Sequence, residues 1–382
     1  MKEFKDILNV GINDETARIF EAQYPVCGMA YNSYLINDEK IAVFDTVDMK
    51  FGDTWFNNLE AALNGKSPDY LIVLHMEPDH SSNIAKFMER YTSATIVSSS
   101  KAFSMMKNFF ENEYAERRII ISEGATLDLG SREISFIAAP MVHWPEVHLA
   151  YDKKDKILFS ADAFGRFGEN TPTPDWKTPA RRYYMGIVAK YGAQVQALLK
   201  KAAGLEINAI FPLHGEILTE NLGYYLNLYN VWSSYASEEN GVAIFYTSVY
   251  GHTEKAVNLL EKELKEKNCP CVEKYNLAEC DMSEAVSAAF RFDKAVFATT
   301  TYNMDVFPFM RDFLERLAER NFQNRTIGLM ENGSWAPNAV KVMQGILEKC
   351  KNLQYCENTV KILSEVSKEN SETISLLAKE LI

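Results

Sequence analysis

The sequence predicts an α/β fold in two domains, residues 1–238 and residues 239–382. Three observations support this prediction. The length of 382 residues suits two domains, and the hydrophobic content of 47% supplies material for two cores. Apolar strand-like runs also alternate with amphipathic helix-like runs, in a pattern that becomes more regular after the polar joint "ASEENG" (236–241). We therefore expect a layered α/β domain followed by a doubly wound parallel sheet.

The first domain opens with two strand-like runs, "MAYNSYLI" and "KIAVFDT", joined by a turn at Asn37 and Asp38. Further strands are expected at 70–75, 94–100, 118–122, 133–140, 156–162 and 208–214, and helices at 54–65, 82–91 and 181–204. Polar residues gather where these strands stop. Ligand sites of layered α/β folds commonly lie at such strand ends, so this edge is the candidate functional site.

The stretch "HMEPDHSSN" (75–83) follows the apolar run "YLIVL" and places two histidines among carboxylates. Pro78 argues against a helix interior here. Metal sites need deprotonated side chains whose lone pairs converge on one point. Four of the six histidines and three acids lie just beyond predicted strands, and we expect them to form one metal site: His75, Glu77, Asp79, His80, His143, Asp162 and His214.

The order and context of these residues resemble the metallo-β-lactamase fold, an αββα sandwich with a two-metal site between its sheets. The pattern of that superfamily is His-x-His-x-Asp-His, and Glu77 stands where it has the second histidine. Mixed imidazole and carboxylate ligands suit iron, whereas histidine-rich sets favour zinc. A binuclear hydrolase with an appended flavodoxin domain is the alternative interpretation, and Glu77 argues against it.

With glutamate at that position, the pattern is similar to the flavodiiron proteins (A-type flavoproteins). The resemblance implies that His75, Glu77 and His143 serve one iron, that Asp79, His80 and His214 serve the other, and that Asp162 bridges them. It also places Tyr191 near the oxidant pocket as a candidate catalytic residue.

The second domain repeats a unit of buried strand, small polar loop and helix, beginning with "VAIFYTS" and the helix-like run up to residue 267. Hydroxyl and small residues in "TSVYGHT" can surround a phosphate at a helix N-terminus. Three strand-end loops resemble those with which flavodoxin binds FMN. This resemblance implies phosphate contacts from Thr247, Ser248, Val249, Tyr250, Gly251, His252 and Thr253, and ring contacts from Thr300, Thr301, Tyr302, Asn303, Asn332, Gly333, Ser334 and Trp335.

Together the two resemblances imply an oxidoreductase that reduces O₂ to water, NO to N₂O, or both, with FMN and two irons per subunit. They also imply a head-to-tail homodimer, or a dimer of such dimers. The six cysteines are interpreted as reduced thiols, so a cytoplasmic location is expected. No C-x-x-C pair or nicotinamide motif is present, so a separate donor is expected: a rubredoxin-like protein, or reduced deazaflavin in a methanogen. The net charge of −12 argues against nucleic acid, and neither a membrane span nor a signal peptide is expected.

Overall fold

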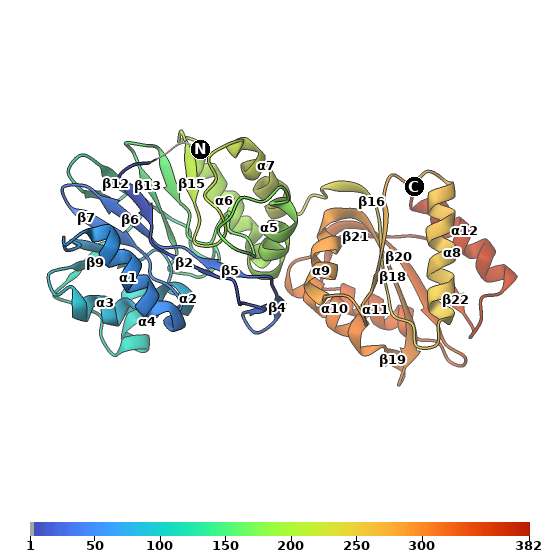
Figure 1. Cartoon of the computed structure of the whole chain (residues 1–382). Coiled ribbons are helices and arrows are strands. Elements are labelled where there is room, and N and C mark those ends of the chain that lie inside the picture. The colour runs from blue at the N-terminus through green and yellow to red at the C-terminus, as the bar shows by residue number, and fades with distance from the viewer. Residues whose placement is uncertain (1–3) are drawn as a thin grey trace. The chain divides into compact units, whose positions relative to one another are not determined.

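The computed structural model describes residues 4–382, which form two compact units (Figure 1). One unit runs up to Tyr183 and includes Ala193–Asn230, while the other combines Tyr184–Gly192 with Val231–Ile382. The chain therefore passes between the units three times. The unit changes for the last time at Asn230, rather than at the single joint after residue 238. Among residues 4–382, no helix is both long enough and apolar enough to cross a membrane.

The first unit is built on two sheets. The first sheet has the order β1-β6-β7-β8-β9-β10, antiparallel from β1 to β7 and parallel from β7 to β10. Its strands are β1 (Ile7–Asn9), β6 (Tyr34–Asn37), β7 (Ile41–Phe44), β8 (Tyr70–Ile72), β9 (Thr95–Ser99) and β10 (Arg118–Ile121). The helices of this part of the chain are α1 (Gly52–Leu63), α2 (Pro78–Ser81), α3 (Ile84–Arg90) and α4 (Ser100–Phe110).

The second sheet has the order β11-β12-β13-β14-β15. Its strands are β11 (Thr126–Asp128), β12 (Glu133–Ala138), β13 (His148–Asp152), β14 (Ile157–Phe159) and β15 (Ala209–Phe211), and its helices are α5 (Lys177–Tyr183), α6 (Gly192–Ala202) and α7 (Leu222–Ser233). Two short ribbons, β2 (Ile12–Asp14) with β5 (Met29–Tyr31) and β3 (Ile19–Phe20) with β4 (Tyr24–Pro25), lie beside the sheets.

The two sheets pack face to face through aromatic side chains. Phe44 of β7 stacks on Phe159 of β14 with ring centroids 4.2 Å apart, and Tyr34 of β6 contacts both Phe159 and Phe211. All four of these side chains are buried. Helices cover the outer faces of the two sheets (Figure 1). The expected αββα sandwich is therefore confirmed.

The single helix expected over 181–204 is interrupted. Helix α5 ends at Tyr183, a π-helical turn covers Tyr184–Val188, a 3₁₀ turn covers Ala189–Tyr191, and α6 starts at Gly192. The apolar spacing of this stretch fits a continuous helix, but the chain changes units on both sides of the interruption. Such π-helical turns are rare and occur often at functional sites.

Pro78 does not lie in a helix interior, as expected, but it begins a short helix, α2, that was not predicted from the sequence. Pro78 is the first residue of that short helix, with Glu77 as its N-cap. Proline is favoured at this position because its fixed φ suits a helix start and its missing N–H would have no helical partner. The helix turns the adjacent Asp79 and His80 inward, and both side chains are buried.

The second unit is a parallel sheet with the order β17-β16-β18-β20-β21, and β19 and β22 pair with β18 and β20. Its strands are β16 (Glu239–Tyr246), β17 (Val272–Asn276), β18 (Phe292–Tyr302), β19 (Asp305–Val306), β20 (Gln323–Asn332), β21 (Lys351–Tyr355) and β22 (Val360–Ile362). Its helices are α8 (His252–Glu266), α9 (Met282–Arg291), α10 (Pro308–Glu319), α11 (Ala339–Leu347) and α12 (Lys368–Glu380).

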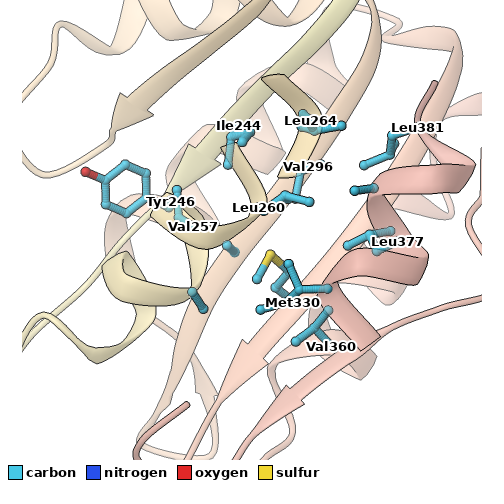
Figure 2. Packing of buried hydrophobic residues seen from close by; sticks show 14 of the residues in the cluster. Ile244, Tyr246, Val257, Leu260, Leu264, Val296, Met330, Val360, Leu377 and Leu381 are labelled. Carbon is cyan, nitrogen blue, oxygen red and sulfur yellow. The ribbon is translucent and has the colours of Figure 1, made fainter. Parts of the chain in front are cut away.

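Helices cover both faces of this sheet, α8 and α12 on one and α9, α10 and α11 on the other (Figure 1). Under α8 and α12, apolar side chains of β16, β18 and β20 interlock with those of the helices (Figure 2). Ile244, Val296 and Met330 come from neighbouring strands and meet Leu260 of α8 and Leu377 of α12 in this core. The expected doubly wound, flavodoxin-like sheet is confirmed.

Candidate metal centre

The seven predicted ligands follow the ends of strands from both sheets of the sandwich. His75 and Glu77 come after β8, and α2 supplies Asp79 and His80. His143 lies in the loop between β12 and β13, Asp162 follows β14 and His214 follows β15. Together they form two groups within which all donor atoms lie within 4.8 Å of one another: His75, Glu77, His143 and Asp162 in the first, and Asp79, His80 and His214 in the second.

Glu77 lies at the centre of the first group. Its Oε2 is 3.2 Å from Nε2 of His75 and 3.0 Å from Nε2 of His143. The second imidazole is also 3.1 Å from Oδ2 of Asp162. A histidine at position 77 would offer one fixed nitrogen, whereas the carboxylate reaches both imidazoles through one oxygen. Glu77, the residue that departs from the hydrolase pattern, thus contacts both histidines of its group.

The second group has the same compactness. Nε2 of His80 and Nε2 of His214 face each other at 3.0 Å, and Oδ2 of Asp79 is 3.4 Å and 3.3 Å from them. Asp162 joins the two groups through its two oxygens. Its Oδ2 lies 3.1 Å from His143 of the first group, and its Oδ1 lies 3.4 Å from His80 of the second. This is the geometry expected of a bridging carboxylate.

The donor set fits two metal ions. Donors that share a first-row metal with bonds of about 2.1 Å stand about 3.0 Å apart at right angles, close to the spacings in both groups. Buried polar atoms normally have hydrogen-bond partners. Within residues 4–382, however, both oxygens of Asp79 and Oδ1 of Asp162 are buried and accept no hydrogen bond. A metal ion would give these oxygens the partner they lack.

Neighbouring groups orient two of the histidine rings. Nδ1 of His75 donates to Oε1 of the buried Glu146 at 2.9 Å, and Nδ1 of His214 donates to the carbonyl oxygen of Ala30 at 2.7 Å. Both bonds leave Nε2 directed into the groups with a lone pair available for a metal. Such partners fix the tautomer and orientation of ligating histidines. Sequence reasoning did not identify Glu146 or Ala30.

In both groups, the imidazoles and the carboxylates shift one another's pKa values. Burial lowers the pKa of His143 and His214, but the carboxylates beside them outweigh burial and raise each pKa to about 9. These are Asp162 and Glu77 for His143, and Asp79 and Asp162 for His214. For Asp162, burial raises the pKa, but the nearby imidazoles hold it well below its usual value. A metal ion must therefore displace protons from the histidines when it binds.

A tyrosine does contact the predicted ligands, but it is Tyr183. Its hydroxyl donates to Oδ2 of Asp162 at 3.0 Å, and its ring is fully buried. Tyr191, the tyrosine singled out from the resemblance, is half-buried in the 3₁₀ turn Ala189–Tyr191 and is grouped with the second unit. The catalytic role expected of Tyr191 stays a prediction. The hydrogen bond from Tyr183 gives this residue a role in orienting the Asp162 carboxylate.

The predicted flavin loops meet at the carboxyl edge of the parallel sheet. A pocket of about 410 Å³ is lined by Val249, Tyr250, Thr300, Thr301, Tyr302, Asn303, Met304, Gly333, Ser334 and Trp335. A second pocket of about 190 Å³ shares several of these residues and adds Ser248, His252, Thr253, Asn332 and Ser364. Pockets of this size suit small-molecule ligands. Their contacts with FMN stay predictions.

Some of the predicted flavin residues do not line these pockets, and some unpredicted ones do. Thr247 is buried, with its hydroxyl 2.6 Å from that of Thr299, and Gly251 supplies the left-handed N-cap of α8 with φ of 84°. Met304 and Ser364 are additions. Ser364 comes from the segment after β22, which no strand-end motif in the sequence singled out.

Comparison with known proteins supports the same two-part organisation. A model of the ODP family beta lactamases matches residues 29–215. An uncharacterized protein of Methanocaldococcus jannaschii is 30% identical over 80% of this chain and 78% of its own length. An anaerobic nitric oxide reductase flavorubredoxin of Aliivibrio fischeri is 28% identical over 82% of this chain, which spans only 65% of that longer protein.

Two solved structures share the whole fold. The rubredoxin oxygen:oxidoreductase of Desulfovibrio gigas has a TM-score of 0.92, 24% identity, and coverage of 99% of this chain and 96% of its own. The flavodiiron protein of Giardia intestinalis has a TM-score of 0.90, 24% identity, and coverage of 98% and 94%. At this identity the likeness establishes the fold.

The fold and the site define a class: a metallo-β-lactamase-like domain with a site for two metal ions, followed by a flavodoxin-like sheet. Within that class, the chain belongs to the flavodiiron protein family.

Proposed function

We propose that this protein reduces O₂ to water, NO to N₂O, or both, at two irons that receive electrons through FMN. The observation that carries the proposal is the arrangement of Glu77 and Asp162: a carboxylate in place of the hydrolase histidine, and a second carboxylate directed at both ligand groups. The names of the flavorubredoxin and of the rubredoxin oxygen:oxidoreductase support the same reaction class. These names favour it over the binuclear hydrolase.

Under this proposal, His75, Glu77 and His143 would hold one iron, Asp79, His80 and His214 would hold the other, and Asp162 would serve both. Two irons held there would supply two electrons for the reduction of a small oxidant. The ring of Phe20 lies edge-on 5.3 Å from His214, and the ring of Trp144 lies 5.3 Å from His75. These apolar surfaces keep water from the imidazoles.

The flavin loops would hold FMN at the carboxyl edge of the second sheet. Ser248 to Thr253 would surround the phosphate at the N-terminus of α8, where the helix dipole favours an anion. The loops after β18 and β20 would contact the ring, and Tyr250 and Trp335 offer exposed aromatic faces, with 88% and 79% of their surface accessible. FMN supplies a carrier that accepts and releases electrons one or two at a time.

The electron donor is proposed to be a separate rubredoxin-like protein, or reduced deazaflavin if the source is a methanogen. The head-to-tail homodimer expected from the family resemblance, which sets the FMN of one subunit against the iron site of another, is likewise proposed. A cytoplasmic location accords with the cysteines, because all six are unpaired.

The decisive experiment starts with metal and flavin analysis of protein reconstituted anaerobically with ferrous iron and FMN. Two irons and one FMN per chain are expected. The protein is then reduced with a rubredoxin and its reductase, and O₂ and NO are added separately, so that the two turnover rates are compared. Two zinc ions together with ester or lactam hydrolysis would support the hydrolase instead.

A matched pair of variants checks the role of the bridge. Asp162→Ala should retain FMN and lose turnover, whereas Asp53→Ala, at an exposed position on α1, should retain both. Full oxidase activity in Asp162→Ala would mean that the sandwich domain is not the site of reduction, and it would favour a third interpretation, an electron carrier whose first domain holds no metal.

A further inference from the structure

A small cavity lies inside the sandwich domain, between the second sheet and helices α6 and α7. Its volume is about 10 Å³. Strands β13 and β14 contribute Leu149 and Leu158, helix α6 contributes Val195 and Ala202, and α7 contributes Leu226. A cavity needs about 10–15 Å³, measured in this way, to hold one water-sized molecule. The space is therefore at the lower limit for one small molecule.

Two residues that line this cavity are direct neighbours, along the chain, of predicted metal ligands. Val142 lines the cavity and immediately precedes the ligand His143. Ala163 also lines it and immediately follows the bridging Asp162. Both residues are buried, each with 1% of its surface exposed. The cavity is thus lined by the chain neighbours of one ligand of the first group and of the residue that joins the two groups.

The chemistry of the wall favours an apolar guest. The lining side chains are aliphatic or aromatic, and the one hydroxyl among them, that of Tyr229, accepts a hydrogen bond from the backbone N–H of Phe164. A buried water usually needs two to four polar partners, whereas apolar cavities stay dry and bind xenon or benzene. Water therefore gains little by entering, and a small apolar gas loses little hydration when it does.

We infer that this cavity is a binding site for a diatomic gas on its way to the metal ligands. The inference rests on the proposed function, because O₂ and NO are its substrates and both are small, weakly hydrated molecules. The site holds gas next to His143 and Asp162 without binding the transition state. Its loss should therefore lower kcat/KM for the gas and leave kcat at saturation unchanged.

Two variants of helix α6 form a matched test. Val195→Ile adds one methylene to a residue of the cavity wall, and Ala197→Val adds two methyl groups to an exposed position on the same helix. Crystals of each protein are exposed to xenon under pressure, which reports the cavity independently of iron, FMN and turnover. Xenon is expected in the unmodified protein and in Ala197→Val, and is expected to be absent from Val195→Ile.

Steady-state rates at varied O₂ and NO complete the test. Val195→Ile should lower kcat/KM by about threefold or more with kcat unchanged, and Ala197→Val should change neither. Ala202→Val fills the same cavity if Val195→Ile does not fold. A cavity without xenon in the unmodified protein overturns the inference, as does an unaltered kcat/KM in a filled variant. Xenon binding in a protein that turns over neither gas overturns the proposed function and leaves the cavity a site for apolar molecules.

Discussion

Replacement of Glu146 by alanine should weaken iron binding although Glu146 is not a ligand. Its buried Oε1 accepts hydrogen bonds from Nδ1 of His75 and from the backbone N–H of Met76, both at 2.9 Å. Burial raises the pKa of Glu146, but the hydrogen bond from His75 outweighs this and holds it below its usual value. The carboxylate is therefore charged, and it fixes the ring that supplies a ligand nitrogen.

The size of the effect follows from these two bonds. A buried donor left without a partner costs about 1–3 kcal/mol. Since about 1.4 kcal/mol corresponds to a tenfold change in binding, misorientation of His75 alone predicts an affinity loss of about 10–100-fold, which is the range typical of partners behind metal ligands. Glu146→Gln keeps an acceptor oxygen of similar reach, so its loss should stay below about tenfold.

The assay is competition for ferrous iron between the protein and a chelator under anaerobic conditions. Glu206→Ala, at an exposed carboxylate in the same domain, serves as the control and should bind iron normally. Circular dichroism checks that each variant is folded. A folded Glu146→Ala protein whose iron affinity lies within twofold of the unmodified protein would refute the reasoning.

Four further outcomes are expected. Tyr183→Phe removes the hydroxyl that donates to Asp162 and should lower iron affinity by up to about tenfold in the same competition, and an unchanged affinity would contradict the role of that bond. When the protein is offered equal amounts of iron and zinc, Glu77→His should bind a larger share of zinc than the unmodified protein, as measured by elemental analysis. An unaltered preference for iron would argue against the importance of this carboxylate. In metal-free protein, His143 and His214 have raised pKa values, so their protonation stabilises the fold fully below about pH 6.5, and this contribution is lost as the pH rises through about 9. The free energy of unfolding, measured by urea denaturation, should therefore decrease from pH 6 to 10. A flat or rising profile would contradict this expectation. Trp335→Ala should weaken FMN binding by up to about tenfold, measured by recovery of flavin fluorescence, if its exposed ring stacks on the flavin.

The ligands could be predicted from the sequence because their residue types are rare and their positions at strand ends are regular. Only six histidines are present, and four of them lie at those positions. Their partners carry no such signal. Glu146 is one of 52 acidic residues and is 71 positions from His75, so its role depends on how β8 and the β12–β13 loop meet in space.

Local structure was less predictable for similar reasons. In "RRYYMG", periodicity cannot decide whether Tyr183 or Tyr184 contacts Asp162, because both are buried. It also gives no sign of the π-helical turn that begins at Tyr184. Helix α4 was missed, although Ser99 accepts a hydrogen bond from the N–H of Ala102 as an N-cap. Ser99, two residues before the run "KAFSMMKNFF", was the available signal.

The interrupted helix also determines how the two halves can be inherited or exchanged. Residues 184–192 belong to the flavin-type unit, where the Tyr235 hydroxyl donates to the carbonyl oxygen of Ala189 at 2.7 Å and the Asn321 side chain donates to that of Lys190 at 2.7 Å. A gene cut at one point near residue 238 would separate Asn321 from Lys190, and it would leave Tyr235, which also belongs to the second unit, on the N-terminal piece. A working chimera between relatives must therefore carry this short insert along with the C-terminal half, so that recombination needs three junctions in place of one.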